Sequence, residues 1–384
     1  MLKGKFPLER FAELRTPFYY YDMALLRRTL DVIRSHMAHN PGYRMHYAVK
    51  ANSNPVILRT IANAGFGADC VSGGEVQAAL DAGFKPSGIV YAGVGKSDWE
   101  INLALDARIS GFNVESEAEL RVIDRLAGEK NVIAPVCLRV NPDIGAHTHS
   151  NITTGLAENK FGINYDMLED VMDVCMSLPN ISYEGLHFHI GSQILDMSDF
   201  AALCNRINSL SESLQRHGYP VGDINVGGGL GINYEHPNHF DMADFDAYFE
   251  TFRKFLNLTP SQLLHFELGR SVVAPCGSLI SRVLYVKEGT SRKFAIIDGS
   301  MTELIRPALY KAYHRVENIS SDEAEEIYDV VGPVCESSDV FVKQASIDKC
   351  HRGDLIAIRS AGAYGESMAS QYNCRPLPPA VFSL

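Results

Sequence analysis

The sequence predicts an α/β protein with an added β part: a (β/α)8 barrel followed by a C-terminal β-sandwich or β-barrel. Short apolar or β-branched runs alternate with helix-like stretches from about residue 45 to residue 270, the pattern of parallel strands joined by helices. Eight such runs occur over about 250 residues, as a (β/α)8 barrel requires. After Arg270 the alternation stops, and strand-like segments separated by turn residues follow.

The eight runs are each followed by a polar or glycine-rich break. In order they are MHYAV (45–49), GADCV (67–71), IVYAG (89–93), GFNVES (111–116), VCLRVN (136–141), EGLHFHI (184–190), DINVGG (223–228) and LHFEL (264–268). Barrel active sites form at the C-terminal ends of the strands, and a purely structural barrel would not need many polar residues there. The ends carry Lys50, Asp69, Lys96, Glu115, Arg139, His189, Gly227 to Gly229, Glu267 and Arg270.

The segment after Arg270 contains four further strand-like runs. They are SLISRVLYV (278–286), KFAIID (293–298), IYDVVG (327–332) and DLIAIRS (354–360). The acidic stretch SSDEAEEIYD (320–329) is expected to be a solvated loop or sheet edge. We expect an N-terminal segment at 1–22 that packs with the β domain, the barrel at 23–272 and the β domain at 273–384.

Composition narrows the classes of function. The net charge of −11 and the pI near 5.6 disfavour nucleic-acid binding, which needs a basic face. No run approaches the roughly 18 apolar residues of a membrane span, and the start of the chain has no secretory pattern. The eight cysteines are irregularly spaced without a CxxC pair, which favours reduced thiols, a cytoplasmic location and no zinc site. We therefore expect a small-molecule partner.

Lys50 is the first candidate catalytic residue, because it ends the first apolar strand in HYAVKAN. A lysine at a barrel mouth beside apolar neighbours is suited to Schiff-base chemistry with a carbonyl group. The alternative is an ordinary solvated lysine.

The glycine run VGGGLG, Val226 to Gly231, is a candidate phosphate site. It lets backbone N–H groups approach closely, and it follows the seventh strand, where barrels often bind phosphate. The alternative is a tight strand-to-helix turn.

Two histidines and a glutamate complete the rim. His187 and His189 lie two apart on one strand and so face the same side, where one could lie against a planar ligand. A metal site is the alternative, but it would need further ligands where the eighth strand offers Glu267 and Arg270. Glu267 lies on a mostly apolar strand and needs a cationic partner. A protonated pyridine nitrogen would serve, and Arg270 is the alternative.

Eight short motifs occur in the order YAVKAN, GADCVSGGE, HFHIGSQ, GGGLG, E-x-GRS, RPALY, GPVCESSD and AGAYGESMASQYN. In this order and spacing they resemble the alanine-racemase-fold family of pyridoxal-phosphate-dependent decarboxylases, and within it the diaminopimelate decarboxylases. They extend over nearly the whole chain. One departure is Leu268, where the family usually has proline; the change alters backbone freedom but no chemical group.

The resemblance implies that pyridoxal 5'-phosphate is carried on Lys50, that His189 stacks on its ring and that Glu267 pairs with the ring nitrogen. The phosphate would be held by Ser192, Gly228, Gly229 and Tyr364, with Asp69 and Arg139 lining the cofactor near the lysine. The substrate would be bound by Arg270, Arg306, Tyr310, Glu336 and Tyr364, and the proton donor would be Cys335 or Lys50. The family also shares each site across a homodimer, with the segment of Cys335 and Glu336 reaching in from the partner subunit.

The implied reaction converts meso-2,6-diaminopimelate, at its D-centre, to L-lysine and carbon dioxide, the last step of lysine biosynthesis. The far end of this substrate carries a carboxylate and an ammonium group. Arg306 could bind the carboxylate with Tyr310 beside it, since residues four apart share one face of a helix, and Glu336 would bind the ammonium. The alternative is a surface Arg306 and an ornithine or arginine decarboxylase. A racemase, a non-catalytic cofactor-binding protein and a metal-dependent hydrolase are the remaining rivals.

Overall fold

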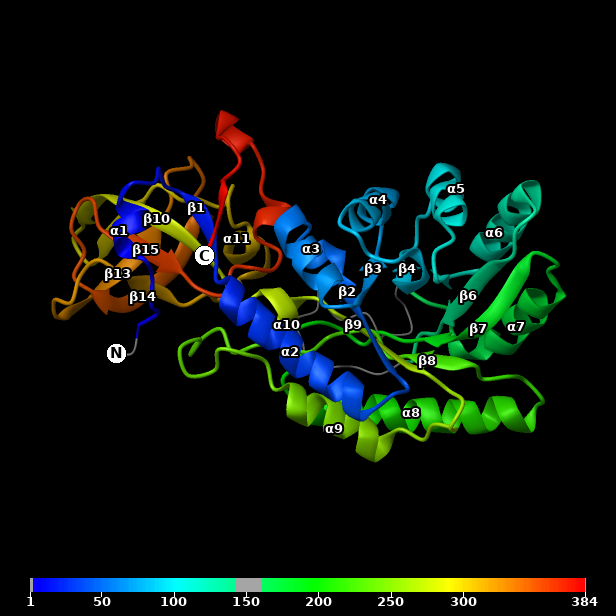
Figure 1. Ribbon diagram of the computed structural model, residues 1–384. Coiled ribbons are helices and arrows are strands. Elements are labelled where there is room, and N and C mark those ends of the chain that lie inside the picture. The colour runs from blue at the N-terminus through cyan, green and yellow to red at the C-terminus, as the bar shows by residue number, and fades with distance from the viewer. Residues whose placement is uncertain (1–2, 143–159, 384) are drawn as a thin grey trace. The chain divides into compact units, whose positions relative to one another are not determined.

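The structure is a computed structural model that describes residues 3–142 and 160–383 (Figure 1). The chain forms two compact units. The barrel unit comprises Leu30–Gly231 and Asp244–Gly269, and the β unit comprises Met1–Thr29, Ile232–Ala243 and Arg270–Leu384. The β unit is thus built from three separate stretches of sequence.

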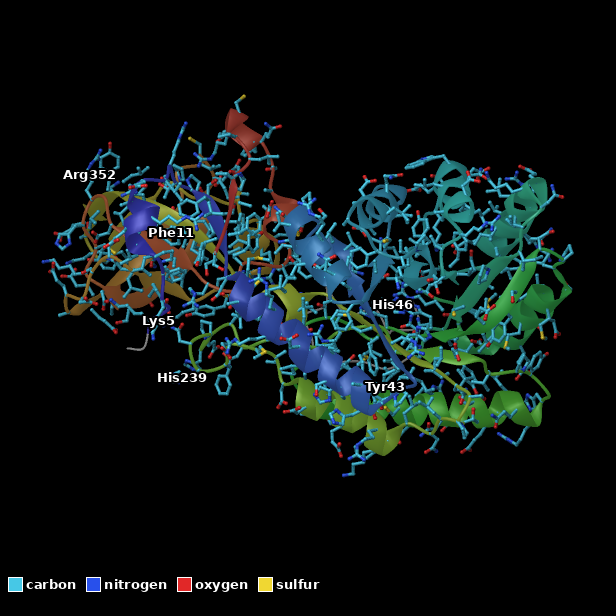
Figure 2. The ribbon with its side chains drawn as sticks, in the orientation of Figure 1. Lys5, Phe11, Tyr43, His46, His239 and Arg352 are labelled. Atoms are coloured by element: carbon cyan, nitrogen blue, oxygen red, sulfur yellow. The ribbon has the colours of Figure 1, made fainter. Side chains whose placement is uncertain are left out.

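Eight parallel strands of the barrel unit close into a barrel in the order β2 to β9. They are β2 (Tyr43–Ala48), β3 (Gly67–Cys70), β4 (Ile89–Tyr91), β5 (Gly111–Val114), β6 (Ala134–Arg139), β7 (Ile181–His187), β8 (Asp223–Asn225) and β9 (Leu264–Leu268). The pairing of β2 with β9 closes the barrel and sets His46, which Figure 2 labels, opposite Glu267. Each strand falls on one of the eight predicted runs, so the predicted (β/α)8 barrel is confirmed.

Helices follow the strands of the barrel, and small polar residues begin several of them. The Ser72 and Ser116 side chains accept hydrogen bonds from the backbone N–H groups of Glu75 and Glu119, which satisfies otherwise unpaired helix donors. The helix α2 (Met23–His39) precedes β2, and the helices that follow strands are α3 (Pro55–Asn63), α4 (Gly73–Asp81), α5 (Asp98–Ala107), α6 (Glu117–Lys130), α7 (Leu168–Ser177), α8 (Met197–Arg216) and α9 (Phe245–Phe255). In the part of the chain that the structure describes, no helix is long and apolar enough to cross a membrane.

Aromatic side chains pack α9 against the outside of β9. The Phe266 ring meets those of Phe249 and Phe252 edge-on, with centroids 5.0 and 5.3 Å apart. Tyr248 lies 5.7 Å from the same ring. Because successive residues of a strand point to opposite faces, Phe266 faces the helices while Glu267 faces the barrel interior.

The β unit contains a mixed sheet with the strand order β12-β15-β10-β11-β13-β14, and β1 joins it through β10 and also pairs with β16. The strands are β1 (Phe18–Tyr21), β10 (Gly277–Glu288), β11 (Lys293–Ile297), β12 (Val316–Asn318), β13 (Glu325–Val331), β14 (Val340–Asp348), β15 (Leu355–Ile358) and β16 (Ala380–Phe382). Three short helices belong to this unit: α1 (Leu8–Ala12), α10 (Arg270–Val273) and α11 (Arg306–Tyr310).

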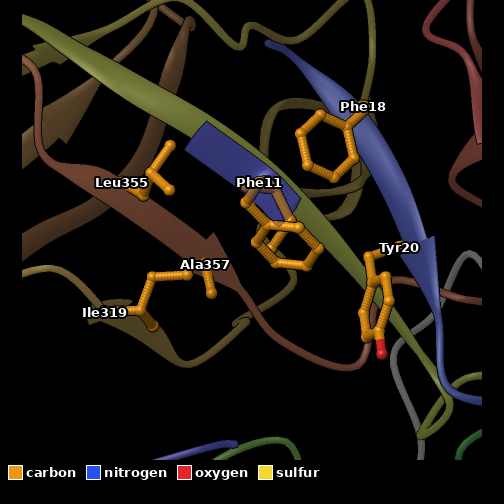
Figure 3. Close-up of a cluster of buried hydrophobic side chains, with 7 residues drawn as sticks. Phe11, Phe18, Tyr20, Ile319, Leu355 and Ala357 are labelled. Carbon is orange, nitrogen blue, oxygen red and sulfur yellow. The ribbon is translucent and has the colours of Figure 1, made fainter. Parts of the chain in front are cut away.

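The N-terminal segment is part of the core of the β unit (Figure 3). Phe11 of α1 packs edge-on against Phe18 and Tyr20 of β1, with centroids 5.1 and 4.9 Å apart. Ile319 and Leu355 belong to the same buried cluster. Burial of these apolar groups, together with the pairing of β1 and β10, attaches the N-terminus to the C-terminal sheet.

The acidic stretch at 320–329 is largely the solvated loop and sheet edge that the sequence predicts, because residues 325–328 pair with β14 alone and only Asp329 also pairs with β11. Residues from Glu325 onward form β13, which pairs with β11 on one side and with β14 on the other. Tyr328 and Val330 on this strand are buried, whereas Glu326 accepts a hydrogen bond from Lys293 at 2.8 Å. Strand pairing therefore orders the second half of the stretch, while the carboxylates of Asp322 and Glu323 in its first half are exposed.

Candidate active site

Lys50 lies in the short 3-10 turn η1 (Val49–Ala51), directly after β2 and at the C-terminal rim of the barrel. Its side chain is 43% exposed, and Nζ lies 3.8 Å from Oδ2 of Asp69 on β3. Lys96, the other rim lysine, is buried and ion-paired with Glu119. Lys50 is therefore the accessible lysine of the two.

Asp69 provides a buried acceptor that the described residues leave unsatisfied. The residue is 1% exposed, and its Oδ1 has no hydrogen-bond partner in residues 3–142 and 160–383. Burial raises the pKa of this carboxyl well above its usual value, Glu267 raises it further, and Lys50 opposes the rise. Because an unsatisfied buried polar atom costs about 1–3 kcal/mol, the position fits a ligand that brings a hydrogen-bond donor.

Glu267 of β9 is held by three side chains from neighbouring strands. Its Oε1 accepts hydrogen bonds from Asn113 Nδ2 at 2.9 Å and Asn225 Nδ2 at 2.8 Å. Its Oε2 lies 2.9 Å from His187 Nε2. Burial acts to raise the pKa of Glu267, but His187 and Lys50 outweigh burial and keep the pKa well below its usual range. The barrel interior thus holds an ionised carboxylate, which fits a cationic ring nitrogen.

His189 and the glycine run meet behind this carboxylate. The backbone N–H of Gly228 donates to His189 Nδ1 at 3.3 Å. Burial lowers the pKa of His189 well below its usual value, and the charges of Arg139 and Lys50 lower it further, so the imidazole is neutral. A Cβ on Gly228 would come within 2.0 Å of the carbonyl oxygen of Glu267, so only glycine fits there. A neutral ring suits stacking on a charged heterocycle.

Arg139, at the end of β6, is fixed by a buried ion pair. Its Nη1 donates to Glu115 Oε1 at 2.6 Å, and the backbone N–H of Gly162 donates to the other oxygen at 2.8 Å. The guanidinium also lies over the Phe161 ring, 4.8 Å from its centroid. These contacts place the cation rigidly at the rim.

In the β unit, Arg270 and Arg306 share one tyrosine hydroxyl. Arg270 Nη1 donates to the Tyr234 hydroxyl at 2.9 Å, and Arg306 Nη1 donates to it at 3.1 Å. Both arginines are buried, and the Arg270 guanidinium lies 4.9 Å from the Tyr364 ring centroid. Burial acts to raise the pKa of Tyr234, but the two arginines outweigh it and lower the pKa. The cluster is therefore strongly cationic.

Arg306 is 5% exposed, so the alternative of a surface arginine is wrong. Besides Tyr234 it contacts His314, whose Nε2 lies 2.7 Å from Arg306 Nη1 and whose Nδ1 donates to the Arg359 carbonyl at 2.8 Å. Burial and the charge of Arg306 lower the pKa of His314 to about 3, which keeps the ring neutral. Among the described residues Arg306 has no carboxylate partner, and a buried cation of this kind is costly unless a ligand supplies the anion.

The other predicted substrate residues also belong to the β unit. Tyr310 ends α11, the helix that Arg306 begins, so the predicted helical spacing is confirmed. Cys335 and Glu336 lie in the connection between β13 and β14, and both side chains are exposed. Glu336 Oε1 accepts a hydrogen bond from the Tyr372 hydroxyl at 2.8 Å.

Several residues of the two clusters were not singled out by the motifs. Asn113 and Asn225 lie on barrel strands. Only the alternation of inward-facing and outward-facing residues along these strands could have indicated that their side chains enter the site. Tyr234 follows the glycine run, and His314 follows α11, but neither belongs to a recognisable pattern. In residues 3–142 and 160–383, no group of three or more histidine, cysteine or acidic residues could hold a metal ion.

The comparisons with known proteins first define a class. Residues 24–274 match the family described as pyridoxal-dependent decarboxylase, pyridoxal binding domain. The accessible Lys50, the ionised Glu267 and the unsatisfied Asp69 fit pyridoxal phosphate, since they offer an amine, an anion and an acceptor. The fold and site are those of a pyridoxal-phosphate-dependent decarboxylase.

More specific likenesses extend over the whole chain. A diaminopimelate decarboxylase of Bacteroides thetaiotaomicron is 62% identical over 382 residues, which cover 100% of this chain and 99% of that protein. A crystal structure of the Helicobacter pylori diaminopimelate decarboxylase complexed with L-lysine is 39% identical, with a TM-score of 0.91 and coverage of 98% of this chain and 94% of that one. A crystal structure of the diaminopimelate decarboxylase from m. jannaschii in co-complex with L-lysine is 34% identical, with a TM-score of 0.88 and coverage of 98% of this chain and 89% of that one. The chain belongs to the diaminopimelate decarboxylase family.

Proposed function

We propose that this chain decarboxylates meso-2,6-diaminopimelate at its D-centre and releases L-lysine and carbon dioxide, the last step of lysine biosynthesis. The observation that supports this substrate is the buried Arg306. It contacts Tyr234 and His314, and it has no carboxylate partner among the described residues. A substrate with a distal carboxylate supplies the missing anion. Ornithine has no distal carboxylate and would leave this cation unpaired, at a cost in transition-state binding.

Pyridoxal 5'-phosphate fits the barrel rim through contacts of three kinds. Lys50 would hold it covalently, Glu267 would pair with the ring nitrogen and His189 would stack on the ring. The neutral state of His189 and the ionised state of Glu267 support this assignment. We assign the phosphate to Ser192, Gly228, Gly229 and Tyr364, and the cofactor lining near the lysine to Asp69 and Arg139.

When bound, pyridoxal phosphate supplies the electron sink for the electron pair that remains as the substrate carboxylate leaves as carbon dioxide. Glu267 keeps the ring nitrogen positive, which makes that sink stronger. Lys50 would hold the cofactor before the substrate binds. Its Nζ, or Sγ of Cys335, would donate the proton to the carbon atom that loses its carboxylate.

The β unit would supply the groups that hold the far end of the substrate. Arg306 and Tyr310 would bind the distal carboxylate, and Glu336 the distal ammonium, while Arg270 and Tyr364 add contacts to the substrate. Fixing both ends lets the chain hold the scissile bond in one orientation, which converts binding energy into rate.

We further propose a homodimer in which Cys335 and Glu336 enter the site of the partner subunit. The likeness of GPVCESSD to the family's cross-subunit segment supports this, as does the exposure of both side chains in the single chain. A cytosolic location fits the eight cysteines, all of which are free thiols.

The test of the function is a comparison of kcat/KM for meso-diaminopimelate, L-ornithine, L-lysine and L-arginine. We expect turnover of diaminopimelate alone, together with an absorbance band of the bound cofactor that borohydride reduction removes. A preference for ornithine or arginine would overturn the substrate assignment, and the absence of the band would overturn the cofactor role of Lys50.

A further inference from the structure

The hydrogen bonds to Glu267 leave it one acceptor position. An ionised carboxylate offers about four lone-pair positions, two on each oxygen. Oε1 accepts from Asn113 at 2.9 Å and from Asn225 at 2.8 Å, which fills both of its positions. Among the described residues, Oε2 receives one hydrogen bond, from His187 at 2.9 Å. The remaining position therefore lies on Oε2.

His187 is built to donate this hydrogen bond. It ends β7 and is 1% exposed, and its Nδ1 is buried without a hydrogen-bond partner among the described residues. A hydrogen on Nδ1 would be an unpaired buried donor, whereas a hydrogen on Nε2 has Glu267 as its acceptor. The pattern puts the ring hydrogen on Nε2.

We propose that His187 is a positioning residue that holds Oε2 of Glu267 and leaves a single acceptor direction for the ring nitrogen of the cofactor. The inference rests on the proposed role of Glu267. Without His187, Oε2 has two open positions, so the carboxylate can tilt or accept water, and its hold on the ring proton weakens. The interactions with His187 also contribute to the lowered pKa of Glu267. His187 acts only through Glu267 and touches no reacting atom.

The test uses holoenzyme reconstituted with pyridoxal phosphate that carries nitrogen-15 in its ring. The chemical shift of this nitrogen reports whether it is protonated, independently of turnover. His187→Met removes the donor, and His187→Gln keeps an amide donor near the position of Nε2. His217→Met is the matched control, because His217 forms a similar histidine–glutamate contact, 2.7 Å from Glu169, on the exposed surface.

We expect a protonated nitrogen in the wild type, in His187→Gln and in His217→Met. In His187→Met the shift should move toward the unprotonated value, and kcat should fall about 10- to 100-fold, as for the loss of a hydrogen bond to a charged group, with little change in KM. A His187→Met enzyme with the wild-type shift and kcat would overturn the proposal and leave the function intact.

Two further outcomes remain decisive. An unprotonated nitrogen in the wild type would overturn the proposed role of Glu267, and the role of His187 with it. If His187→Met does not bind the cofactor, His187→Asn replaces it, because an asparagine amide reaches the position of Nδ1 but not that of Nε2. Equal shifts in the Asn and Gln variants would then refute the proposal.

Discussion

Replacing Arg306 with methionine separates its role in binding from its role in folding. Methionine fills much of the same volume but carries neither the charge nor the hydrogen bonds to Tyr234 and His314. Removing one partner of a buried charge pair costs about 2–5 kcal/mol. We therefore expect kcat/KM for meso-diaminopimelate to fall by a factor of about 30 to 5,000.

Folding stability should respond quite differently. The variant loses two hydrogen bonds, each worth about 1.5–3 kcal/mol because the donor is charged, but it also removes a buried cation that costs several kcal/mol. The two effects oppose each other, so the free energy of unfolding should change by no more than about 2 kcal/mol. A large loss of activity with near-normal stability is the signature of a ligand-binding arginine.

The assay compares meso-diaminopimelate with D-lysine, which has the same reacting D-centre but no distal carboxylate. The wild type should strongly prefer diaminopimelate, and Arg306→Met should lose most of that preference. Arg352→Met is the matched control, because Arg352 also lies over a tyrosine ring of the β unit, 4.8 Å from the Tyr285 centroid, but is exposed (Figure 2). If Arg306→Met retains the preference, the arginine does not bind the distal carboxylate.

Four further results are expected. Lys50→Ala should lose the cofactor absorbance band and turnover but keep its thermal midpoint, because a half-exposed lysine contributes little to folding; normal turnover in this variant would exclude Lys50 as the cofactor lysine. Glu267→Gln should retain the cofactor, while kcat for decarboxylation should fall by a factor of about 100 to 1,000. An unchanged kcat would show that the ring nitrogen does not need this charge. Burial and the charge of His265 lower the pKa of His46 to about 4, so His46 stays neutral in the folded protein. The unfolded chain takes up a proton at this residue below about pH 6.5. The folded state is therefore destabilised as the pH falls from about 6.5 towards 4, by up to about 1.4 kcal/mol per pH unit. His46→Gln should accordingly lose less thermal stability between pH 7 and pH 5 than the wild type, and an equal loss would refute the assignment. Mixing inactive Lys50→Ala with inactive Glu336→Ala should recover about a quarter of the wild-type activity after subunit exchange, whereas no recovery after proven exchange would place Glu336 in the site of its own subunit.

The barrel and its rim were predictable because two simple rules act together. Parallel strands read as apolar runs separated by helices, and their C-terminal ends meet on one rim. Lys50 and Asp69 were therefore expected to be neighbours, and the structure puts Nζ of one 3.8 Å from Oδ2 of the other. The same rules also put Lys96 at the rim. Its side chain is nevertheless buried in an ion pair with Glu119 of α6, and this burial depends on helix packing that the sequence pattern does not show.

The partners of the buried charges could not be predicted. Glu267 was expected to pair with a ring nitrogen or with Arg270, yet within the chain its carboxylate is bound by Asn113, Asn225 and His187. These three come from three other strands, at sequence separations of 154, 42 and 80 residues. Only the closed barrel brings them together, and no local pattern marks an asparagine as a donor to a distant carboxylate.

Two buried groups lack a matching partner among the described residues, and both point to a bound ligand. Asp69 Oδ1 lacks a donor, and the Arg306 guanidinium lacks an anion, although both residues are almost fully buried. Such groups oppose folding, and natural structures rarely keep them without a reason. One calls for a donor or a cation and the other for a carboxylate, so they require different chemical groups. A bound cofactor would supply the donor for Asp69, and a substrate with a second carboxylate would supply the anion for Arg306, whereas a monocarboxylate substrate would leave Arg306 without one.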